Sequence, residues 1–121
     1  MTLYHFTCSH GYSSIGSAGL LRPMTQVAMP VPYRLVWLTD LDVCDKRALG
    51  LQSEIVLTCD RSEYRYRVDD DGDVETFDEW ADSVHLDRSF RSALMFGRKP
   101  RHWFVSMFPV PVSLAAGKDK P

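Results

Sequence analysis

The segment 102–108, HWFVSMF, places the strongest constraint on the fold. It is apolar at nearly every position, whereas a strand with one solvated face alternates apolar and polar residues. A short apolar run of this kind is typical of a strand covered on both faces. We therefore expect a sheet with packed elements on each side, and 121 residues are enough for one such domain.

A second segment, 62–68, has the opposite pattern. In its sequence SEYRYRV the two tyrosines and Val68 fall on one face, and the glutamate and arginines fall on the other. This alternation predicts a half-exposed strand. Asp71 and Gly72 follow and are suited to a tight turn. We expect this turn to join the strand to residues 74–77 in a hairpin.

Two short helices are predicted among the strands. Residues 10–18 form the first, and Gly19 is placed to end it. Residues 87–96 form the second, with Asp87 as the N-cap and with Phe90 and Leu94 four residues apart on one face. Further strands are expected at 2–7, 33–39 and 53–59, a loop at 24–32, and an edge strand with prolines at 108–113.

The order of these elements determines the fold class. Most strands follow one another without a helix between them, which favours an α+β fold with a split, largely antiparallel sheet over a doubly wound parallel one. We expect a single domain over residues 1–114. Residues 115–121, AAGKDKP, are small and polar and predict a flexible tail.

Charge and cysteine content restrict the partners and the compartment. The net charge of −2 gives no global attraction to nucleic acid or to an anionic membrane. No apolar run reaches the length needed to span a membrane. Three widely spaced cysteines argue against a disulfide framework, so we expect a cytoplasmic protein. A local basic patch is nevertheless present, at Arg88, Arg91, Arg98, Lys99 and Arg101.

His5 lies in the middle of the apolar opening stretch LYHFT and has three possible roles. It is a core histidine, a metal ligand or part of a ligand site. A metal site with Cys8 and His10 is disfavoured because an extended strand points these side chains to different faces. The acidic run at 69–73 does not predict a calcium loop, because Arg67 would occupy the first ligand position. We therefore expect no metal.

Three short motifs decide how His5 is interpreted. They are YHFT at 4–7, followed by a short predicted helix with Ile15, then GLLRP at 19–23, and LVWLTDLD at 35–42. In this order and spacing they resemble the opening of the ADP-ribosyltransferase fold. That clan contains NAD-using toxins, poly-ADP-ribosylating enzymes and RNA 2′-phosphotransferases. The resemblance covers about residues 3–42 and leaves the rest of the chain unmatched.

The resemblance implies that NAD is the substrate and that His5 is both a catalytic and a binding residue. In the family the first-strand histidine hydrogen-bonds a ribose hydroxyl, and the backbone beside it holds the nicotinamide amide. Imidazole is able to donate to or accept from a hydroxyl. The remaining residues expected to bind the cofactor are Thr7, Tyr12, Arg22, Tyr33, Trp37 and Thr39.

The chain departs from the family at the late glutamate that stabilises the positive charge developing on the ribose. The last predicted strand contains no acidic residue, so Glu54 and Glu79 are the candidates for this role. Two functions follow. The first is a small NAD-dependent ADP-ribosyltransferase, a toxin or a phage protein, acting on a protein or nucleic-acid target. The alternative is a catalytically inactive module of the same fold that binds a nucleotide-like ligand or a protein partner.

Overall fold

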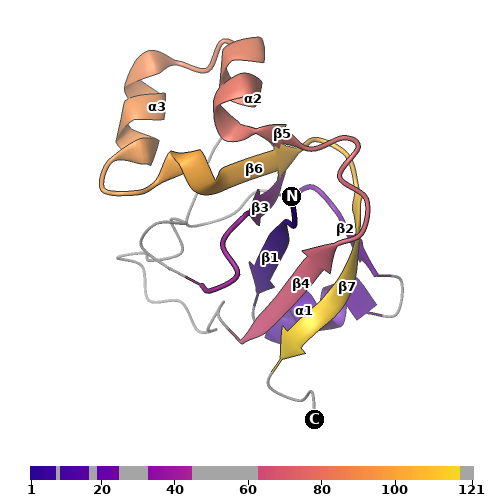
Figure 1. Cartoon of the computed structure of the whole chain (residues 1–121). Helices are drawn as coiled ribbons and strands as arrows, with labels where there is room; N and C mark the ends of the chain where they lie inside the picture. Colours follow the sequence, from indigo (N-terminus) through magenta and orange to yellow (C-terminus); the bar gives the residue numbers. More distant parts are fainter. Residues whose placement is uncertain (8, 17–18, 25–32, 45–62, 118–121) are drawn as a thin grey trace.

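The computed structural model describes residues 1–7, 9–16, 19–24, 33–44 and 63–117. These residues form an antiparallel sheet of seven strands in the order β2-β7-β4-β1-β3-β6-β5, together with a few short helices (Figure 1). The expected α+β class with a largely antiparallel sheet is confirmed. The strands are β1 (Tyr4–Thr7), β2 (Leu20–Leu21), β3 (Val36–Thr39), β4 (Tyr64–Val68), β5 (Glu75–Thr76), β6 (Trp103–Ser106) and β7 (Val110–Gly117). The helices are α1 (Ser9–Ile15), α2 (Phe77–Ser83), α3 (Arg88–Met95) and the 3-10 helix η2 (Pro100–His102).

One face of the sheet is packed with aromatic residues under α2 and α3. Phe77 and Trp80 of α2 are completely buried, and Leu94 of α3 joins them. The ring of Phe77 meets the ring of Trp103 edge to face, with 5.1 Å between the centroids. This arrangement is favourable for aromatic pairs. We call this face of the sheet the aromatic face.

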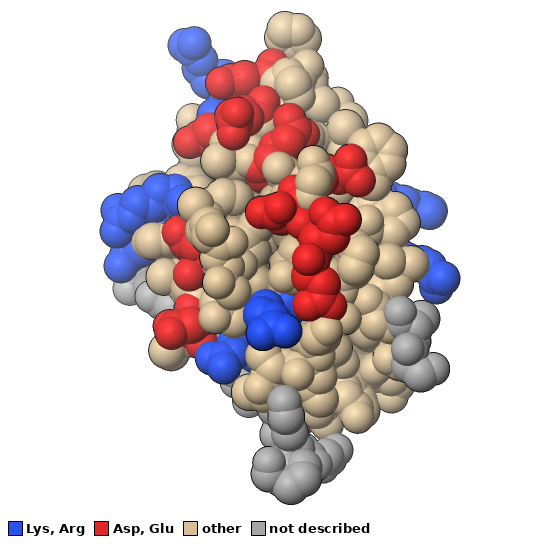
Figure 2. Space-filling view, turned by 45° about the vertical axis from the view of Figure 1, so that its right-hand side comes forward, with Lys and Arg blue, Asp and Glu red and all other residues tan. Residues whose placement is uncertain are grey.

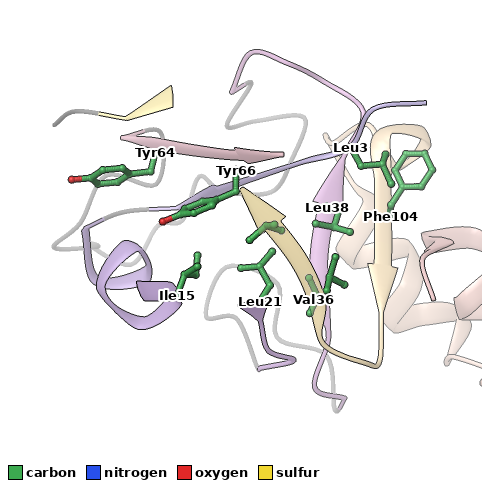
Figure 3. Packing of buried hydrophobic residues seen from close by; sticks show 10 residues of the cluster. Leu3, Ile15, Leu21, Val36, Leu38, Tyr64, Tyr66 and Phe104 are labelled. Atoms are coloured by element: carbon green, nitrogen blue, oxygen red, sulfur yellow. The ribbon is translucent and has the colours of Figure 1, made fainter. Parts of the chain in front are cut away.

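The other face is covered by α1, and the edge strand β2 contributes to the same core. Its buried cluster includes Ile15 of α1, Leu21 of β2, and Tyr64 and Tyr66 of β4, with aliphatic residues of β3 and β7 between them (Figure 3). Leu3 also belongs to this cluster, whereas Tyr4 and Phe6 pack in the aromatic face. Because side chains alternate along a strand, His5 and Thr7 share the side of Leu3. We call this side the His5 face.

Several sequence predictions are confirmed. All four residues of β6 are buried, as expected of a strand covered on both sides. In β4, Tyr64 and Tyr66 are buried while Arg67 is exposed. The side chain of Asp87 accepts a hydrogen bond from the backbone N–H of Phe90 at 3.0 Å and caps α3. Gly97, just after α3, adopts a positive φ of 71°, which glycine tolerates.

The predicted hairpin between residues 62–68 and 74–77 is wrong. Glu75 and Thr76 pair with β6 at the far edge of the sheet, and the helix α2 begins directly at Phe77. The backbone N–H of Glu79 donates to Thr76 Oγ1, and this hydroxyl donates to Glu79 Oε1. This arrangement resembles a capping box, except that the Glu79 carboxylate accepts from the threonine hydroxyl and not from the Thr76 N–H, and we call it the capping box of α2. It begins a helix where the apolar residues suggested a strand.

The C-terminal prediction also needs correction. The strand β7 lies between β2 and β4 and is not an edge strand. The proline at 111 lacks an N–H, but its carbonyl accepts from Asp69 N, and the next residue, Val112, donates to Gly19 O. The strand continues to Gly117, three residues into the predicted tail. The strand expected at 53–59, residues 25–32 of the expected loop and residues 118–121 lie outside the described residues.

Candidate ligand site around His5

The strands β1 and β3 separate next to His5. They are paired at one position, Tyr4 with Thr39, whereas β3 and β6 are paired along their full length. The imidazole of His5 reaches across this separation, and its Nδ1 lies 2.8 Å from the carbonyl oxygen of Trp37. A carbonyl oxygen only accepts, so Nδ1 carries the hydrogen and donates it. The separation in the sheet therefore fixes both the position and the tautomer of a partly buried histidine.

Tyrosine side chains gather beside His5. In the pairing of β1 with β4, His5 lies opposite Tyr66 and Thr7 lies opposite Tyr64. The ring of Tyr12 in α1 stacks on Tyr64, with 4.4 Å between centroids and 15° between planes. Both β4 rings extend on the same side of the sheet, toward α1 (Figure 3). His5, Thr7, Tyr12, Tyr64 and Tyr66 form what we call the His5 cluster.

Burial influences the chemistry of this cluster. Burial of the Tyr66 phenol raises its pKa above the ordinary 10.0, and a negative charge on Tyr12 would raise it further. Tyr66 therefore stays protonated at neutral pH and is able to donate a hydrogen bond. Imidazole and phenol groups on a fixed sheet are well suited to recognise the hydroxyl and amide groups of a ligand.

The turn from β1 into α1 brings the cluster together. A Cβ atom on Gly11 would collide with Thr7 Oγ1. The first turn of α1 therefore sits directly against the end of β1, and Gly11 has no side chain where contact is closest. This short connection places Tyr12 over Tyr64.

Trp37 and Thr39 lie on the other side of the sheet. Paired residues of neighbouring strands share a face, so the pairing of Thr39 with Tyr4 places both residues on the aromatic face. The Trp37 ring is buried there against Phe77, and Thr39 Oγ1 accepts from Leu41 N at 3.1 Å. Trp37 thus contributes only its carbonyl to the His5 cluster, which corrects its predicted role as a ring at the site.

The structure does not bring the other predicted residues to His5. Tyr33 packs edge to face on Trp80, on the aromatic face. Arg22 is exposed just after β2, which is the edge strand beyond β7. Glu79 is exposed on α2, also at the aromatic face, and forms the capping box with Thr76. Glu54 lies outside the described residues.

Two features of the structure were missed from the sequence. Tyr64 and Tyr66 were recognised only as the buried side of a strand. The second is a polar pair, in which His102 Nδ1 lies 2.7 Å from Asp40 Oδ1. Asp40 directly follows Thr39 and His102 directly precedes Trp103, the last paired residues of β3 and β6 at this end. Asp40 and His102 are 62 residues apart in the sequence, so only the register of β3 against β6 reveals the pair.

Comparisons with known proteins add no relative. The chain matches no family model, no curated protein and no solved structure. Among the described residues, no group of three or more histidine, cysteine, aspartate or glutamate side chains is arranged to hold a metal ion. No helix in the same part of the chain is long and apolar enough to cross a membrane.

Proposed function

We propose that the chain is a small ADP-ribosyltransferase-like protein that binds NAD at the His5 cluster. The observation that carries the proposal is the separation of β1 from β3, spanned by the hydrogen bond from His5 Nδ1 to Trp37 O. The resemblance of residues 3–42 to the transferase clan gives this histidine the same role, contact with a ribose hydroxyl. Thr7, Tyr12 and Tyr66 supply further hydroxyl groups on the same side.

The geometry suits a nucleotide that is recognised mainly through neutral groups. A histidine with a fixed tautomer presents a defined hydrogen-bonding edge to a ribose. The stacked pair of Tyr12 and Tyr64 provides an aromatic surface for a nicotinamide ring. The rigid sheet holds these groups in place, which lowers the entropic cost of binding.

A second candidate function, a binding module that no longer catalyses the transfer, is favoured by one observation. Of the two glutamates expected to stabilise the developing positive charge, Glu79 is used in the capping box of α2 on the other side of the sheet. An electrostatic catalyst must lie beside the reacting carbon. Glu54 is therefore the stronger remaining candidate for an active transferase.

The test is calorimetric titration of the protein with NAD, beside an assay for released nicotinamide. We expect His5→Ala to weaken NAD binding at least about ten-fold while the protein stays folded, because it loses a ribose contact. His85→Asn is the matched control. His85 is exposed near the aromatic face, and asparagine tolerates its positive φ of 53°.

Each outcome decides between the functions. NAD binding with nicotinamide release supports the transferase, and loss of release in Glu54→Gln would identify the carboxylate. Glu79→Gln keeps the capping box, since glutamine also serves in it, so we expect no change in release. Binding without release favours the inactive module. Absence of NAD binding by the unmodified protein overturns the transferase and the NAD site, and leaves only a module for another ligand or a protein partner. Unfolding of His5→Gln as well as His5→Ala makes His5 a core residue.

A further inference from the structure

The segment between α3 and β6 combines an exposed aromatic ring with exposed cations. Phe96 follows the last residue of α3 and is 86% exposed, whereas most large apolar side chains of the described residues are buried. Lys99 and Arg101 follow within five residues and are exposed as well. We call residues 96–102, FGRKPRH, the basic loop.

The basic loop is held in a defined shape. At its start, Arg98 N donates to Met95 O at 3.0 Å, and Arg98 Nη1 donates to Leu94 O at 2.6 Å. At its end, His102 N donates to Lys99 O, forming the short helix η2. The ring of His102 is fixed by Asp40. The loop therefore presents its exposed side chains from a fixed backbone.

The structure separates the cations of the predicted basic patch. Arg91 donates to Asp82 at 2.6 Å and to Asp78 at 2.8 Å. The hydrogen bonds to these two carboxylates, with Asp82 the larger cause, raise the pKa of Arg91 further above its ordinary value. Its charge is thus neutralised within the protein. Arg91 must be removed from the patch.

Lys99 and Arg101 differ from Arg91 in this respect. Arg101 donates through Nε to His102 Nε2 at 3.2 Å, which leaves its terminal nitrogens outward on an exposed residue. In the described part of the chain, neither Lys99 nor Arg101 forms an ion pair with a carboxylate. Their charges remain available to an external anion.

Many of the acidic residues gather in one region of the surface (Figure 2). In Figure 2 they gather in a band across the visible face, while lysine and arginine side chains stand mainly near its margins. The exposed acids include Asp70, Asp71 and Asp73 after β4, and Asp78 and Asp82 of α2. Asp78 and Asp82 are paired with Arg91, so the net charge of −2 does not exclude local attraction of a polyanion.

We propose that the basic loop binds single-stranded nucleic acid. Phe96 offers a ring on which a base stacks, and Lys99 and Arg101 contact the phosphates on either side. An exposed aromatic among unpaired cations is the combination used for single strands, because every base has a face and every nucleotide a phosphate. Double-stranded nucleic acid hides its bases within the stack and would not use Phe96. If the proposed transferase function holds, the bound nucleic acid is the acceptor of the ADP-ribose. Only this assignment of the acceptor rests on the proposed function.

The test is fluorescence anisotropy of a labelled single-stranded RNA titrated with the whole protein in the absence of NAD. We expect Phe96→Ala to weaken binding by about ten-fold or more through lost stacking, while Phe96→Tyr binds as the unmodified protein does. Lys99→Ala and Arg101→Ala should each lower the slope of log affinity against log salt concentration by about 0.7. Arg67→Ala, on β4, removes an equal charge elsewhere and should leave binding unchanged.

Several results would overturn the proposal. The first is that the single strand does not bind even at low salt, and the second is that Phe96→Ala binds it with unchanged affinity. The third is that poly-glutamate binds as well as the single strand, which would indicate a site for an acidic protein instead. A duplex that binds as well as the single strand would also contradict the stacking role of Phe96. Because no NAD is present, failure of the proposed NAD site leaves this result unaffected. Circular dichroism checks that each variant is folded. We expect this result because the side chains of Phe96, Lys99 and Arg101 are exposed.

Discussion

The two faces of the sheet are built from different chemistry. On the aromatic face, the rings of Trp37, Phe77, Trp80 and Trp103 meet one another at centroid distances of 5.1–6.0 Å. On the His5 face, aliphatic residues cover one part of the sheet, and imidazole, hydroxyl and phenol groups occupy the other. Both faces are buried, and among the residues that the structure describes the cluster of polar side chains around His5 lies on the His5 face.

The strand β1 contributes side chains to both faces of the sheet. In β1, Tyr4 and Phe6 point into the aromatic face, while His5 and Thr7 point to the other side. The aromatic residues anchor the strand through burial of a large apolar area, which is the dominant favourable contribution to folding. The polar residues are therefore held rigidly without having to stabilise the sheet themselves. Rigid support of this kind is what a binding site requires.

The largest effect is expected from removal of an aromatic anchor. Trp80 is fully buried and contacts both Phe77 and Tyr33. We expect Trp80→Ala to lower the free energy of unfolding by about 3–5 kcal/mol, because it leaves a large cavity. Urea denaturation measures this loss, and Trp80→Phe should recover part of it. If Trp80→Ala kept its stability but lost NAD binding, the assignment of stability to the aromatic face and of ligand binding to the His5 face would be wrong.

A smaller effect is expected at the junction of β1 and α1. Gly11→Ala introduces a Cβ atom that collides with Thr7 Oγ1. We expect a loss of about 1–3 kcal/mol in the free energy of unfolding, reduced by the better helix propensity of alanine. Displacement of α1 should also disturb the stacking of Tyr12 on Tyr64, so NAD binding should weaken.

The double variant Gly11→Ala with Thr7→Ala separates collision from other causes. Removal of Thr7 Oγ1 relieves the closest collision but leaves the Cβ of residue 7 at 3.0 Å from the new Cβ, so stability should return in part relative to Gly11→Ala alone. Ser13→Ala, an exposed position of the same helix, is the control for helix propensity. A double variant no more stable than the single one would show that the close contact of Gly11 and Thr7 does not position α1.

Local patterns in the sequence predicted the local structure well. The alternation in 62–68 identified the buried tyrosines of β4, and Asp87 marked the start of α3 because capping depends on residues three positions apart. The start of α2 carries an equally local signal, Thr76 and Glu79, whereas the predicted hairpin rests on the Asp71-Gly72 turn and the residues at 74–77.

The register between distant strands could not be read from the sequence. In the stretch VWLT, the tryptophan and the threonine share a face, but only the pairing of Tyr4 with Thr39 decides that this face is opposite to His5. A shift of one residue would have placed Trp37 beside His5, as predicted. The same dependence on register hid the pair of Asp40 and His102. Features of the site that depend on the alternation of residues within one strand or helix could be predicted from the sequence. Features that depend on the pairing of distant strands could not.

The smallest effect is expected from the phenol of Tyr66, and it appears only in alkali. Burial raises the pKa of this group above 10.0, while the unfolded chain ionises near that value. Below the unfolded pKa the group is protonated in both states, and its contribution to stability is fully present. As the pH rises through the window between the two pKa values, the unfolded state releases a proton that the folded state retains. The stability of the unmodified protein must therefore fall over this window.

Tyr66→Phe removes this one contribution and sharpens the comparison of the two faces. We expect the unmodified protein to lose stability relative to Tyr66→Phe as the pH rises above about 10, as measured by urea denaturation at each pH. Tyr33→Phe, an exposed ring at the aromatic face, is the matched control for removal of a tyrosine hydroxyl. A pH dependence that is equal in the unmodified protein and in Tyr66→Phe would mean that the phenol is as well solvated in the folded protein as in the unfolded chain. The His5 cluster would then not be the water-shielded site that its proposed ligand requires.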